Sequence, residues 1–446
     1  MVIYILLMNT GGCMGNLVTV ADAAKELEVS ADTIRRWEKK GLIKSERSEN
    51  NYRLFNTDEI RILHDKVSGK SGGVNRFRIL KEQAGTNYTS IDLFAGAGGT
   101  ALGLENAGLK HVLLNEFDLA AANTLRKNRP HWNVNDKDIH DLSFKKYAGK
   151  VDVVEGGFPC QSFSYAGKKL GFDDTRGTLF HEFARCVDEV RPKIAIGENV
   201  KGLLTHDEGR TLKTMLAVLQ NLGYRVAYRV MKSQYMDVPQ KRERLVIIGV
   251  RDDIKSDILF PKEKNYTVSL REAIGDTPES PGQEYTDKKA KVMKLVPQGG
   301  YWRDLPLDIQ KEYMMTSFYM GGGKTGMARR LSWDEPSLTL TCNPAQKQTE
   351  RCHPVHTRPL NIREYARIQT FPDEWEFTGS IAAQYKQIGN AVPVNLGYYL
   401  GRCAISMIEG TFNEDSMVKV EALSEILSDE IPVQGEGNNK KVAVGG

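Results

Sequence analysis

The sequence predicts an α/β fold: a doubly wound, mostly parallel sheet with a smaller irregular domain and an N-terminal winged helix-turn-helix. The first observation is that short apolar strands alternate with helical stretches between residues 88 and 260, as in βαβ units. The expected strands are Thr89–Phe94, His111–Glu116, Val151–Glu155, Ile194–Glu198, Arg225–Val230 and Leu245–Val250. The second is that residues 261–357 show scattered proline and glycine and little periodicity. The third is a pair of short helices before residue 68.

Length and composition describe a globular protein with more than one domain. The chain has 446 residues, of which 40% are hydrophobic and 26% are charged, and its formal net charge is +4. This mildly basic balance permits a polyanionic partner. The six cysteines show no paired short spacing, and no segment is long and apolar enough to span a bilayer. We therefore expect a cytoplasmic protein without a disulfide framework or a membrane anchor.

The N-terminal module begins with two short helices around a tight turn. Helices are expected at Ala21–Glu28 and at Ala31–Lys40, and Ser30 can cap the second one. Ile34 and Trp37 share one face of that second helix, which leaves its basic residues for solvent. Two short helices of which the second is basic form the pattern of a DNA-reading helix-turn-helix.

A hairpin, or wing, is expected after the second helix, at Ser48–Phe55. With this wing, the module resembles the N-terminal module of the MerR family of regulators. The resemblance implies DNA binding, and the candidate DNA-binding residues are Arg35, Arg36 and Arg53. The alternative is a solvated helical pair that only packs against its neighbour.

A glycine-rich turn follows the first strand of the sheet, in the run Asp92–Gly99. Such a turn lets a ligand approach the backbone at the start of the next helix. Glu116 ends the second strand, where an acid suits a ribose diol. Asp138 follows the next short stretch and could accept a hydrogen bond from an adenine amino group. For each acid alone, a solvated strand end is the other interpretation.

The most informative run is Gly156–Gly167, which contains Gly-Gly-Phe-Pro-Cys-Gln and leaves the carboxyl end of a strand. Open α/β sheets bind their ligands at that edge. Cys160 is the candidate nucleophile, because a thiolate is the strongest side-chain nucleophile near neutral pH. Pro159 stiffens the turn ahead of it, and Glu198 ends the next strand at the same edge, where a partly desolvated carboxyl can donate a proton. A buried structural thiol is the alternative for Cys160.

Three polar residues lie where a later strand begins, at Gln240, Arg242 and Arg244. Alternate residues of a strand share a face. We therefore expect Arg242 and Arg244 to point into one cleft.

These motifs, in this order, resemble those of the DNA cytosine-5 methyltransferases. The matching blocks are Asp-Leu-Phe-Ala-Gly-x-Gly-Gly from Asp92, Gly-Phe-Pro-Cys-Gln-x-Phe-Ser from Gly157, Glu-Asn-Val from Glu198, Gln-x-Arg-x-Arg from Gln240, and the stretches Arg358–Asp373 and Tyr385–Val394. The resemblance implies the fold of the S-adenosylmethionine-dependent methyltransferases, with S-adenosylmethionine as the cofactor. It calls for no metal.

The resemblance also implies a role for each catalytic candidate. Cys160 would add to carbon 6 of a cytosine that has been flipped out of the duplex. Glu198 would engage ring N3 and the exocyclic amine, Arg244 would hold the carbonyl oxygen, and Arg242 would lie in the same cleft. The implied cofactor contacts are Phe94, Gly96, Gly98, Glu116, Phe117, Asp138, Ile139, Pro159 and Asn390.

Candidate DNA contacts follow from the same resemblance. Gln161 and Ser162 would approach the gap that the flipped base leaves, Arg176 would anchor the far end of their loop, and Gln240 would also contact DNA. Residues 261–357 correspond to the target-recognition domain, in which Arg329 and Arg330 can bind phosphate or read guanine edges. The same stretch holds Cys342, Cys352, His353 and His356. Their spacing is not that of a structural zinc site, so we expect no metal.

The expected order of segments combines these observations. It runs 1–16, a disordered or mis-annotated start; 17–67, the MerR-like helix-turn-helix; 68–87, a linker; 88–260, the catalytic methyltransferase domain; 261–357, the target-recognition domain; 358–408, a C-terminal return to the catalytic domain; and 409–446, a polar tail.

The resemblance implies site-specific methylation of cytosine in double-stranded DNA, as the modification enzyme of a restriction–modification system with a cognate restriction endonuclease. We hypothesise that the helix-turn-helix also represses the enzyme's own promoter. The alternatives are a transcriptional regulator with an inactive methyltransferase domain and an RNA cytosine methyltransferase. We expect a monomer, with a dimer through the N-terminal module as the alternative.

Overall fold

The computed structural model describes residues 17–27, 29–48, 51–57, 59–60, 63, 75–159 and 178–424. These residues belong to two compact units. Unit 1 comprises Met1–Asn75, Glu284–Asp334 and Ala345–Pro359, and unit 2 comprises Arg76–Gln283, Glu335–Pro344 and Leu360–Gly446. The predictions made for Cys160, Gln161, Ser162 and Arg176 lie outside the described residues. Within the described part, no helix is long and apolar enough to cross a membrane.

A seven-stranded sheet forms the centre of unit 2, in the order β6-β5-β4-β7-β8-β11-β9. Its strands are β6 (Val134–Asn135), β5 (Lys110–Asn115), β4 (Thr89–Leu93), β7 (Val153–Gly156), β8 (Ile194–Val200), β11 (Glu243–Arg251) and β9 (Tyr224–Lys232). The pairings from β6 to β8 are parallel, and β11 runs antiparallel to β8 and β9. The predicted mostly parallel α/β sheet is therefore confirmed, and each predicted strand corresponds to one of these strands.

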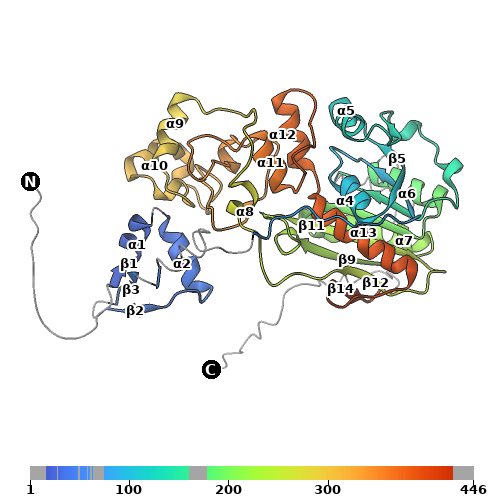
Figure 1. The fold of residues 1–446 in the computed structure, drawn as a ribbon, viewed down its shortest axis with the longest axis horizontal. Coiled ribbons are helices and arrows are strands. Elements are labelled where there is room, and N and C mark those ends of the chain that lie inside the picture. The colour runs from blue at the N-terminus through green and yellow to red at the C-terminus, as the bar shows by residue number, and fades with distance from the viewer. Residues whose placement is uncertain are drawn as a thin grey trace, which may run out of the picture. The chain divides into compact units, whose positions relative to one another are not determined.

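Helices cover both faces of this sheet (Figure 1). Successive strand residues point to opposite faces, so Val154 and Ala195 pack in the core on the side of α6 (Leu179–Val190) and α7 (Arg210–Asn221). Their neighbours Val153 and Ile194 pack in the opposite core, with α4 (Gly99–Ala107) and α13 (Val394–Glu409). Strands buried on both faces explain the near-continuous apolar runs in the sequence.

Small residues bring α4 and α13 into close contact. A Cβ atom at Gly103 would lie 2.4 Å from the carbonyl oxygen of Val394, and one at Gly99 would lie 2.0 Å from that of Val392. A Cβ atom at Gly401 would lie 2.6 Å from the Ala107 methyl group. The C-terminal segment therefore returns to the helix that follows the glycine-rich turn.

Further elements complete unit 2. They are α5 (Leu119–Asn128), β10 (Gln240–Lys241) parallel to β13 (Ser337–Leu338), β12 (Ile258–Pro261) antiparallel to β14 (Met417–Val420), α8 (Leu270–Ile274), α11 (Ile362–Ile368) and α12 (Ile381–Asn390). Residues 76–87, expected to belong to the linker, pack on this unit: the Asn395 side chain donates to Arg78 O and accepts from Leu80 N. Parts of the range expected for the recognition domain, 261–283 and 335–344, also belong to unit 2.

Unit 1 contains the N-terminal module. Its strands β1 (Leu17–Thr19), β2 (Ser45–Arg47) and β3 (Arg53–Asn56) form a sheet in the order β1-β3-β2, beside α1 (Val20–Glu26) and α2 (Ala31–Lys39). The Ser30 hydroxyl accepts from Thr33 N and caps α2, as predicted. Ile34 and Trp37 are buried with Phe55 in one small core, which accounts for the amphipathic pattern of α2.

The rest of unit 1, Glu284–Asp334 with Ala345–Pro359, is here called the irregular segment. It holds α9 (Asp287–Lys294) and α10 (Leu307–Met314) around a core that includes Met293, Trp302 and Cys352. Single 3₁₀ turns in the two units lie at Ile139–Asp141, Lys145–Tyr147, Lys201–Leu204, Ser233–Tyr235, Trp302–Asp304, Met315–Phe318 and Lys347–Thr349. The turn His206–Gly209 contains two residues with positive φ, Asp207 and Glu208.

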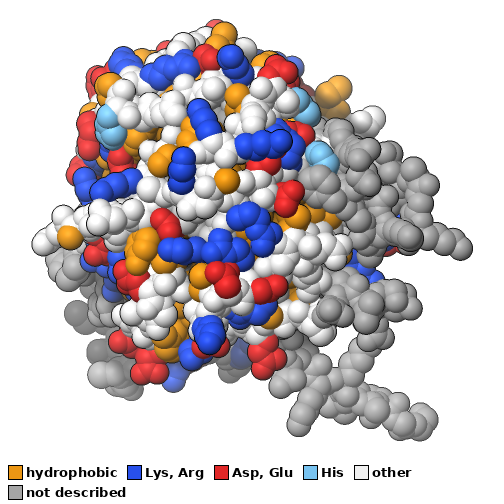
Figure 2. Space-filling model, turned by 90° about the vertical axis from the view of Figure 1, so that its right-hand side faces the viewer, with side chains coloured by type: hydrophobic (Ala, Val, Ile, Leu, Met, Phe, Trp, Pro, Cys, Tyr) orange, Lys and Arg blue, Asp and Glu red, His pale blue; other side chains and the backbone are white. Residues whose placement is uncertain are grey.

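Charges of both signs are interleaved on the molecular face shown in Figure 2, and hydrophobic side chains form only small separate spots there. This distribution agrees with the nearly balanced formal charge of +4.

We predict that Gly103→Ala lowers the free energy of unfolding by about 1–3 kcal/mol, because the added methyl group would push α13 away from α4. Urea unfolding of the full chain measures this change. Gly202→Ala is the matched control, because its Cβ would meet only the Val200 side chain, at 4.0 Å. Equal urea midpoints for the two variants would contradict the close α4–α13 contact.

Candidate active site

A cavity of about 510 Å³ lies at the carboxyl edge of the sheet. Seven residues that the sequence analysis selected line it together: Phe94, Gly96, Glu116, Pro159, Glu198, Arg244 and Asn390. Most follow the ends of β4, β5, β7 and β8, which is the edge where open α/β sheets bind their ligands. The cavity volume falls within the usual range for small-molecule sites.

Glu116 fixes the glycine-rich turn at one end of this cavity. One carboxylate oxygen accepts a hydrogen bond from Gly96 N, and the other accepts from Asp118 N, both at 2.7 Å. Burial raises the pKa of Glu116 above its ordinary value. Phe117 follows with a side chain that is 68% exposed, so it is available to cover a ligand. Gly98 has φ +86° and precedes α4, where a Cβ would lie 2.6 Å from the Leu125 side chain.

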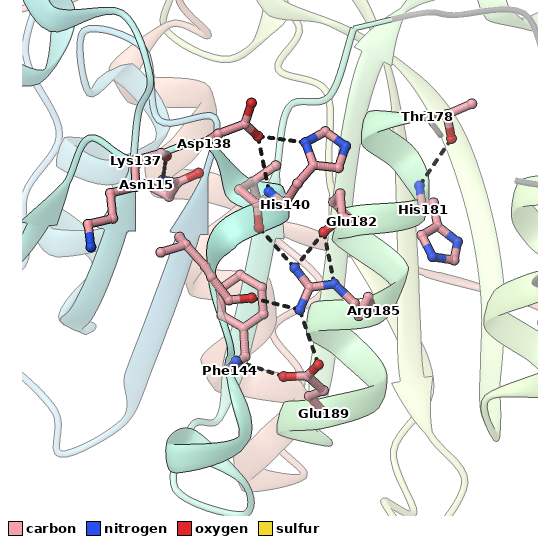
Figure 3. Close-up of polar contacts among 12 residues, drawn as sticks. Asn115, Lys137, Asp138, His140, Phe144, Thr178, His181, Glu182, Arg185 and Glu189 are labelled. Atoms are coloured by element: carbon pink, nitrogen blue, oxygen red, sulfur yellow. Dashed lines mark hydrogen bonds and ion pairs between the residues drawn. The ribbon is translucent and has the colours of Figure 1, made fainter. Parts of the chain in front are cut away.

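Asp138 and Ile139 are held by a polar network shown in Figure 3. Asp138 accepts from His140 N at 3.0 Å and pairs with the His140 ring at 2.6 Å. Arg185 donates to Ile139 O at 2.9 Å and pairs with Glu182 and Glu189. The 3₁₀ turn is thereby fixed against α6, although neither Asp138 nor Ile139 is among the residues that line the cavity.

Glu198 and Arg244 form a buried ion pair in the cavity wall, with 2.8 Å between Arg244 Nε and Glu198 Oε1. Burial raises the pKa of Glu198, although the positive charges of Arg244 and Arg242 oppose the rise. A carboxyl group in this environment can hold a proton closer to neutral pH than an exposed one. The pair therefore offers a hydrogen-bonding carboxyl and a cation side by side.

Arg242 and Arg244 share a cleft as expected, since both line a second cavity of about 330 Å³. Only Arg244 also lines the first cavity, and Arg242 does not. It is buried, and its guanidinium donates to Gly389 O and Asn390 O, both at 3.2 Å. Arg242 lies at the break between β10 and β11. Its observed contacts hold the backbone next to Asn390.

Gln240 also stabilises the backbone next to Asn390, through Gln369. The prediction that Gln240 contacts DNA is wrong, because its side chain is not exposed. Its side chain is fully buried and donates to Gln369 Oε1 at 2.8 Å. Gln369 in turn donates to Ile388 O at 2.7 Å and to Ala391 O at 3.0 Å. The Asn390 side chain accepts from the Cys342 thiol at 3.0 Å.

The predicted DNA-binding arginines of unit 1 differ in exposure. The prediction that Arg330 binds DNA is wrong, because its side chain is buried. It donates to Met293 O, Val296 O and His353 O within the irregular segment. Arg329 is partly buried, with its guanidinium over the Tyr301 ring. In the N-terminal module, Arg36 is partly buried and donates to Asp32 O and Thr33 Oγ1. Arg35 and Arg53 are exposed, and they pair with Asp32 and Glu38.

The His353 and His356 ring centroids lie 4.7 Å apart, and the Cys352 thiol donates to His356 O. Among the described residues, no group of three or more His, Cys, Asp or Glu side chains could hold a metal ion. His353 instead accepts from Val355 N and His356 N through its Nδ1.

Asp92 and Glu155 form a buried carboxyl pair that the sequence did not predict. The two residues are register partners on the parallel strands β4 and β7, and both line the cavity. Burial raises the pKa of Asp92 to about 7 and that of Glu155 well above its ordinary value. Within the described residues, the only group that could donate a hydrogen bond to the Asp92 carboxylate is a protonated Glu155 carboxyl. Both acids adjoin motifs that the sequence analysis used, which was the available signal.

Two family models match the chain. The model of the C-5 cytosine-specific DNA methylases matches residues 88–405, and that of the MerR family regulatory proteins matches residues 19–55. Among curated proteins, the chain is 55% identical over 403 residues to the type II methyltransferase M.Eco47II of Escherichia coli, covering 88% of this chain and 96% of that one. It is 59% identical over 332 residues to M.PspPI of a Psychrobacter strain, covering 72% and 80%. It is 54% identical over 326 residues to M.Sau96I of Staphylococcus aureus, covering 72% and 76%.

The fold also resembles solved structures at low sequence identity. A DNMT2 of Spodoptera frugiperda aligns with a TM-score of 0.52 and 17% identity, covering 72% of this chain and all of that one. The methyltransferase EhMeth of Entamoeba histolytica aligns with a TM-score of 0.50 and 13% identity, covering 72% and 98%.

We predict that the buried carboxyl pair makes stability fall with rising pH. Because the pKa of Asp92 is raised to about 7 in the folded chain, the folded state binds more protons than the unfolded state between about pH 4 and pH 7. The free energy of unfolding of Asp92→Asn should therefore rise relative to the wild type as pH increases from 5 to 7. Urea unfolding at each pH measures this difference, with the exposed Glu414→Gln as control. A pH-independent difference would contradict the prediction.

Proposed function

The chain belongs to the C-5 cytosine-specific DNA methylase family, and on that premise we propose that it methylates cytosine at a specific duplex site through Cys160. The observation that carries the proposal is the Glu198–Arg244 pair in the wall of the cavity, beside Pro159. Pro159 directly precedes Cys160 in the chain, so the nucleophile follows a described residue that lines the same cavity.

The residues of the cavity fit S-adenosylmethionine. The cofactor carries a cationic amino acid part and a ribose, and the cavity offers acids and amide groups to both. Glu116 and Asn390 are the residues that we propose would hold it, with Phe94 and Phe117 beside the glycine-rich turn. Asp138 and Ile139 lie on a fixed turn beyond β5 and would contact the adenine. When bound, S-adenosylmethionine supplies the methyl group as an electrophile.

In this proposal, Cys160, Glu198 and Arg244 carry out the reaction in the following steps. The Cys160 thiolate adds to carbon 6 of cytosine, and the electron pair of the 5,6 double bond moves towards carbon 5 and N3. Glu198, protonated, donates to N3 and accepts from the exocyclic amine, while Arg244 donates to the carbonyl oxygen. Bound S-adenosylmethionine would supply the methyl group to carbon 5 and would keep the electron pair of the broken sulfur–methyl bond. A base removes the carbon 5 proton, the double bond re-forms, the N3 proton returns to Glu198, and the Cys160 thiolate leaves.

Buried hydrogen bonds fix two backbone segments next to this site. The Asn199 side chain donates to Phe158 O at 2.8 Å and fixes the backbone immediately before Pro159. The Arg242 and Gln369 contacts fix the segment that carries Asn390. Arg242 is therefore a positioning residue for the cofactor end of the cavity.

The target cytosine has to leave the duplex to reach this cavity. We propose that Gln161 and Ser162 fill the gap in the helix, that Arg176 anchors their loop, and that the irregular segment, with Arg329, reads the site. The high identity to type II methyltransferases supports a role as the modification enzyme beside a cognate endonuclease, acting on DNA in the cytoplasm. We propose that the catalytic part acts as a monomer.

The experiment that tests this function is expression in a host that lacks cytosine methylation, followed by bisulfite sequencing of the genome. The proposal expects one short sequence to be protected throughout the genome, and expects protection to disappear in Cys160→Ser. Unprotected cytosines despite folded, DNA-bound wild-type protein would contradict it.

We predict that Glu198→Gln lowers kcat by about 10²- to 10⁴-fold, because an amide cannot deliver a proton to N3. The affinity for S-adenosylmethionine should stay near the wild-type value, because Glu198 faces the base in our proposal. Methyl transfer from labelled cofactor and equilibrium binding measure the two quantities. Glu409→Gln, at the exposed end of α13, is the control and should keep the wild-type rate. A fall in cofactor affinity that accounts for the whole loss would contradict the assigned role.

A further inference from the structure

The N-terminal module is joined to the irregular segment at the start of α2. Ser30 N donates to Gln298 O at 2.9 Å, and Val29 pairs with Gln298 in a parallel bridge. Val29 and Ser30 are 3% and 1% exposed, although both precede a short surface helix. The cap of α2 is therefore buried in a backbone contact with the irregular segment.

A glycine makes this contact possible. Gly299 has φ +72°, and a Cβ there would lie 2.9 Å from Thr33 Oγ1 and 3.5 Å from Ser30 Oγ. Thr33, in the first turn of α2, is fully buried. On its other side Gly299 N donates to Leu331 O, which anchors the glycine within the irregular segment. Asp304 is also close, since the charges of Asp32 and Arg35 act on its carboxyl group, whose pKa burial raises.

The irregular segment contacts the first turn of α2. In a helix-turn-helix, the N-terminal residues of the second helix are the ones that contact base edges. Here Ser30 and Thr33 are covered by the irregular segment, while the Asp32 side chain in the same turn is 48% exposed. The face of α2 that carries Ser30 and Thr33 is therefore not open to a major groove. The N-terminal module is therefore not free to read an operator through this face of α2.

The remainder of the module still carries exposed cations. They lie in the middle and at the end of α2, in the turn after it and in the strands of the wing: Arg35, Lys39, Lys40, Lys44, Arg47 and Arg53. Glu38 and Asp32 pair with two of them, and Lys39 and Lys40 stand side by side where α2 ends. Exposed lysines and arginines of this kind bind the phosphate backbone without reading sequence.

We propose that the module works as a fixed extension of the target-recognition region, clamped to it through Gly299 and the first turn of α2, and that its exposed cations hold duplex DNA flanking the methylated site. This inference rests on the proposed function, because it assumes that the irregular segment faces the target DNA. It differs from the hypothesis of promoter repression, which requires the first turn of α2 to read an operator.

The first test compares two duplexes with full-length protein. One is short and carries only the target site, and the other adds long flanks of arbitrary sequence. We expect Lys39→Gln/Lys40→Gln to leave methylation of the short duplex unchanged and to reduce the salt slope of binding to the long duplex by about two. The matched control, Lys262→Gln/Lys419→Gln, removes two exposed lysines near β12 and β14 and should leave both unchanged.

The second test removes the clamp without removing a charge. Thr33→Leu enlarges a fully buried side chain that faces Gly299, and alters only the module. We expect it to reduce the long-duplex salt slope as much as the lysine variant does, with the short-duplex rate retained. Gly299→Val should lower the long-duplex salt slope as well, while Gly321→Val, whose Cβ would meet no described heavy atom within 4 Å, should not. The retained short-duplex rate is expected of Thr33→Leu alone, because Gly299 belongs to the segment that we propose reads the site.

The outcomes separate this proposal from the proposed function. A short duplex that is never methylated contradicts the function itself. Normal methylation of the short duplex with an unchanged salt slope in Thr33→Leu contradicts the clamp. Loss of the short-duplex rate in Thr33→Leu contradicts a flank-holding role, since the contact would then serve catalysis. Specific binding of the wild type to a promoter that lacks the target site contradicts it as well.

Discussion

The contact between α4 and α13 is the constraint on which the site of unit 2 depends. Gly99 and Gly103 let the backbone of residues 392–398 approach within the space that a single Cβ would fill. This contact places Asn390, far along the chain, at the same cavity as the glycine-rich turn after β4. Without it, the carboxyl edge of the sheet would keep its acids but lose one wall of the cavity.

Buried polar side chains then set the fine geometry around that cavity. Arg242 and Gln369 both donate to backbone carbonyls between residues 388 and 391, and Asn395 ties Arg78 and Asp237 together. Each of these groups would be costly to bury without its partners, so each fixes the segments that supply them. The ion pair of Glu198 with Arg244 is a further instance, and in our proposal it also contacts the substrate.

The sheet could be predicted from the sequence because strands buried on both faces leave local apolar runs bounded by glycine-rich turns. The members of the cavity could also be predicted, since parallel strands end at one edge. The hydrogen bonds by which Arg242, Gln240 and Arg330 fix the backbone could not be predicted. Their partners lie 147, 129 and up to 37 residues away, and no local pattern records those distances. Asp92 and Glu155 were missed because their pairing depends on strand order.

The intact mass of the chain tests the covalent role of Cys160 most directly. The protein is reacted, in the presence of S-adenosylmethionine, with a duplex that carries 5-fluorocytosine throughout one strand. A fluorine at carbon 5 cannot leave as a proton does, so the thiolate addition at carbon 6 cannot be reversed once the methyl group is transferred. We expect the wild-type chain to gain the mass of the DNA strand through a peptide containing Cys160, and Cys160→Ser to gain none. A methylating enzyme without this adduct, or with an adduct at another residue, would contradict the account.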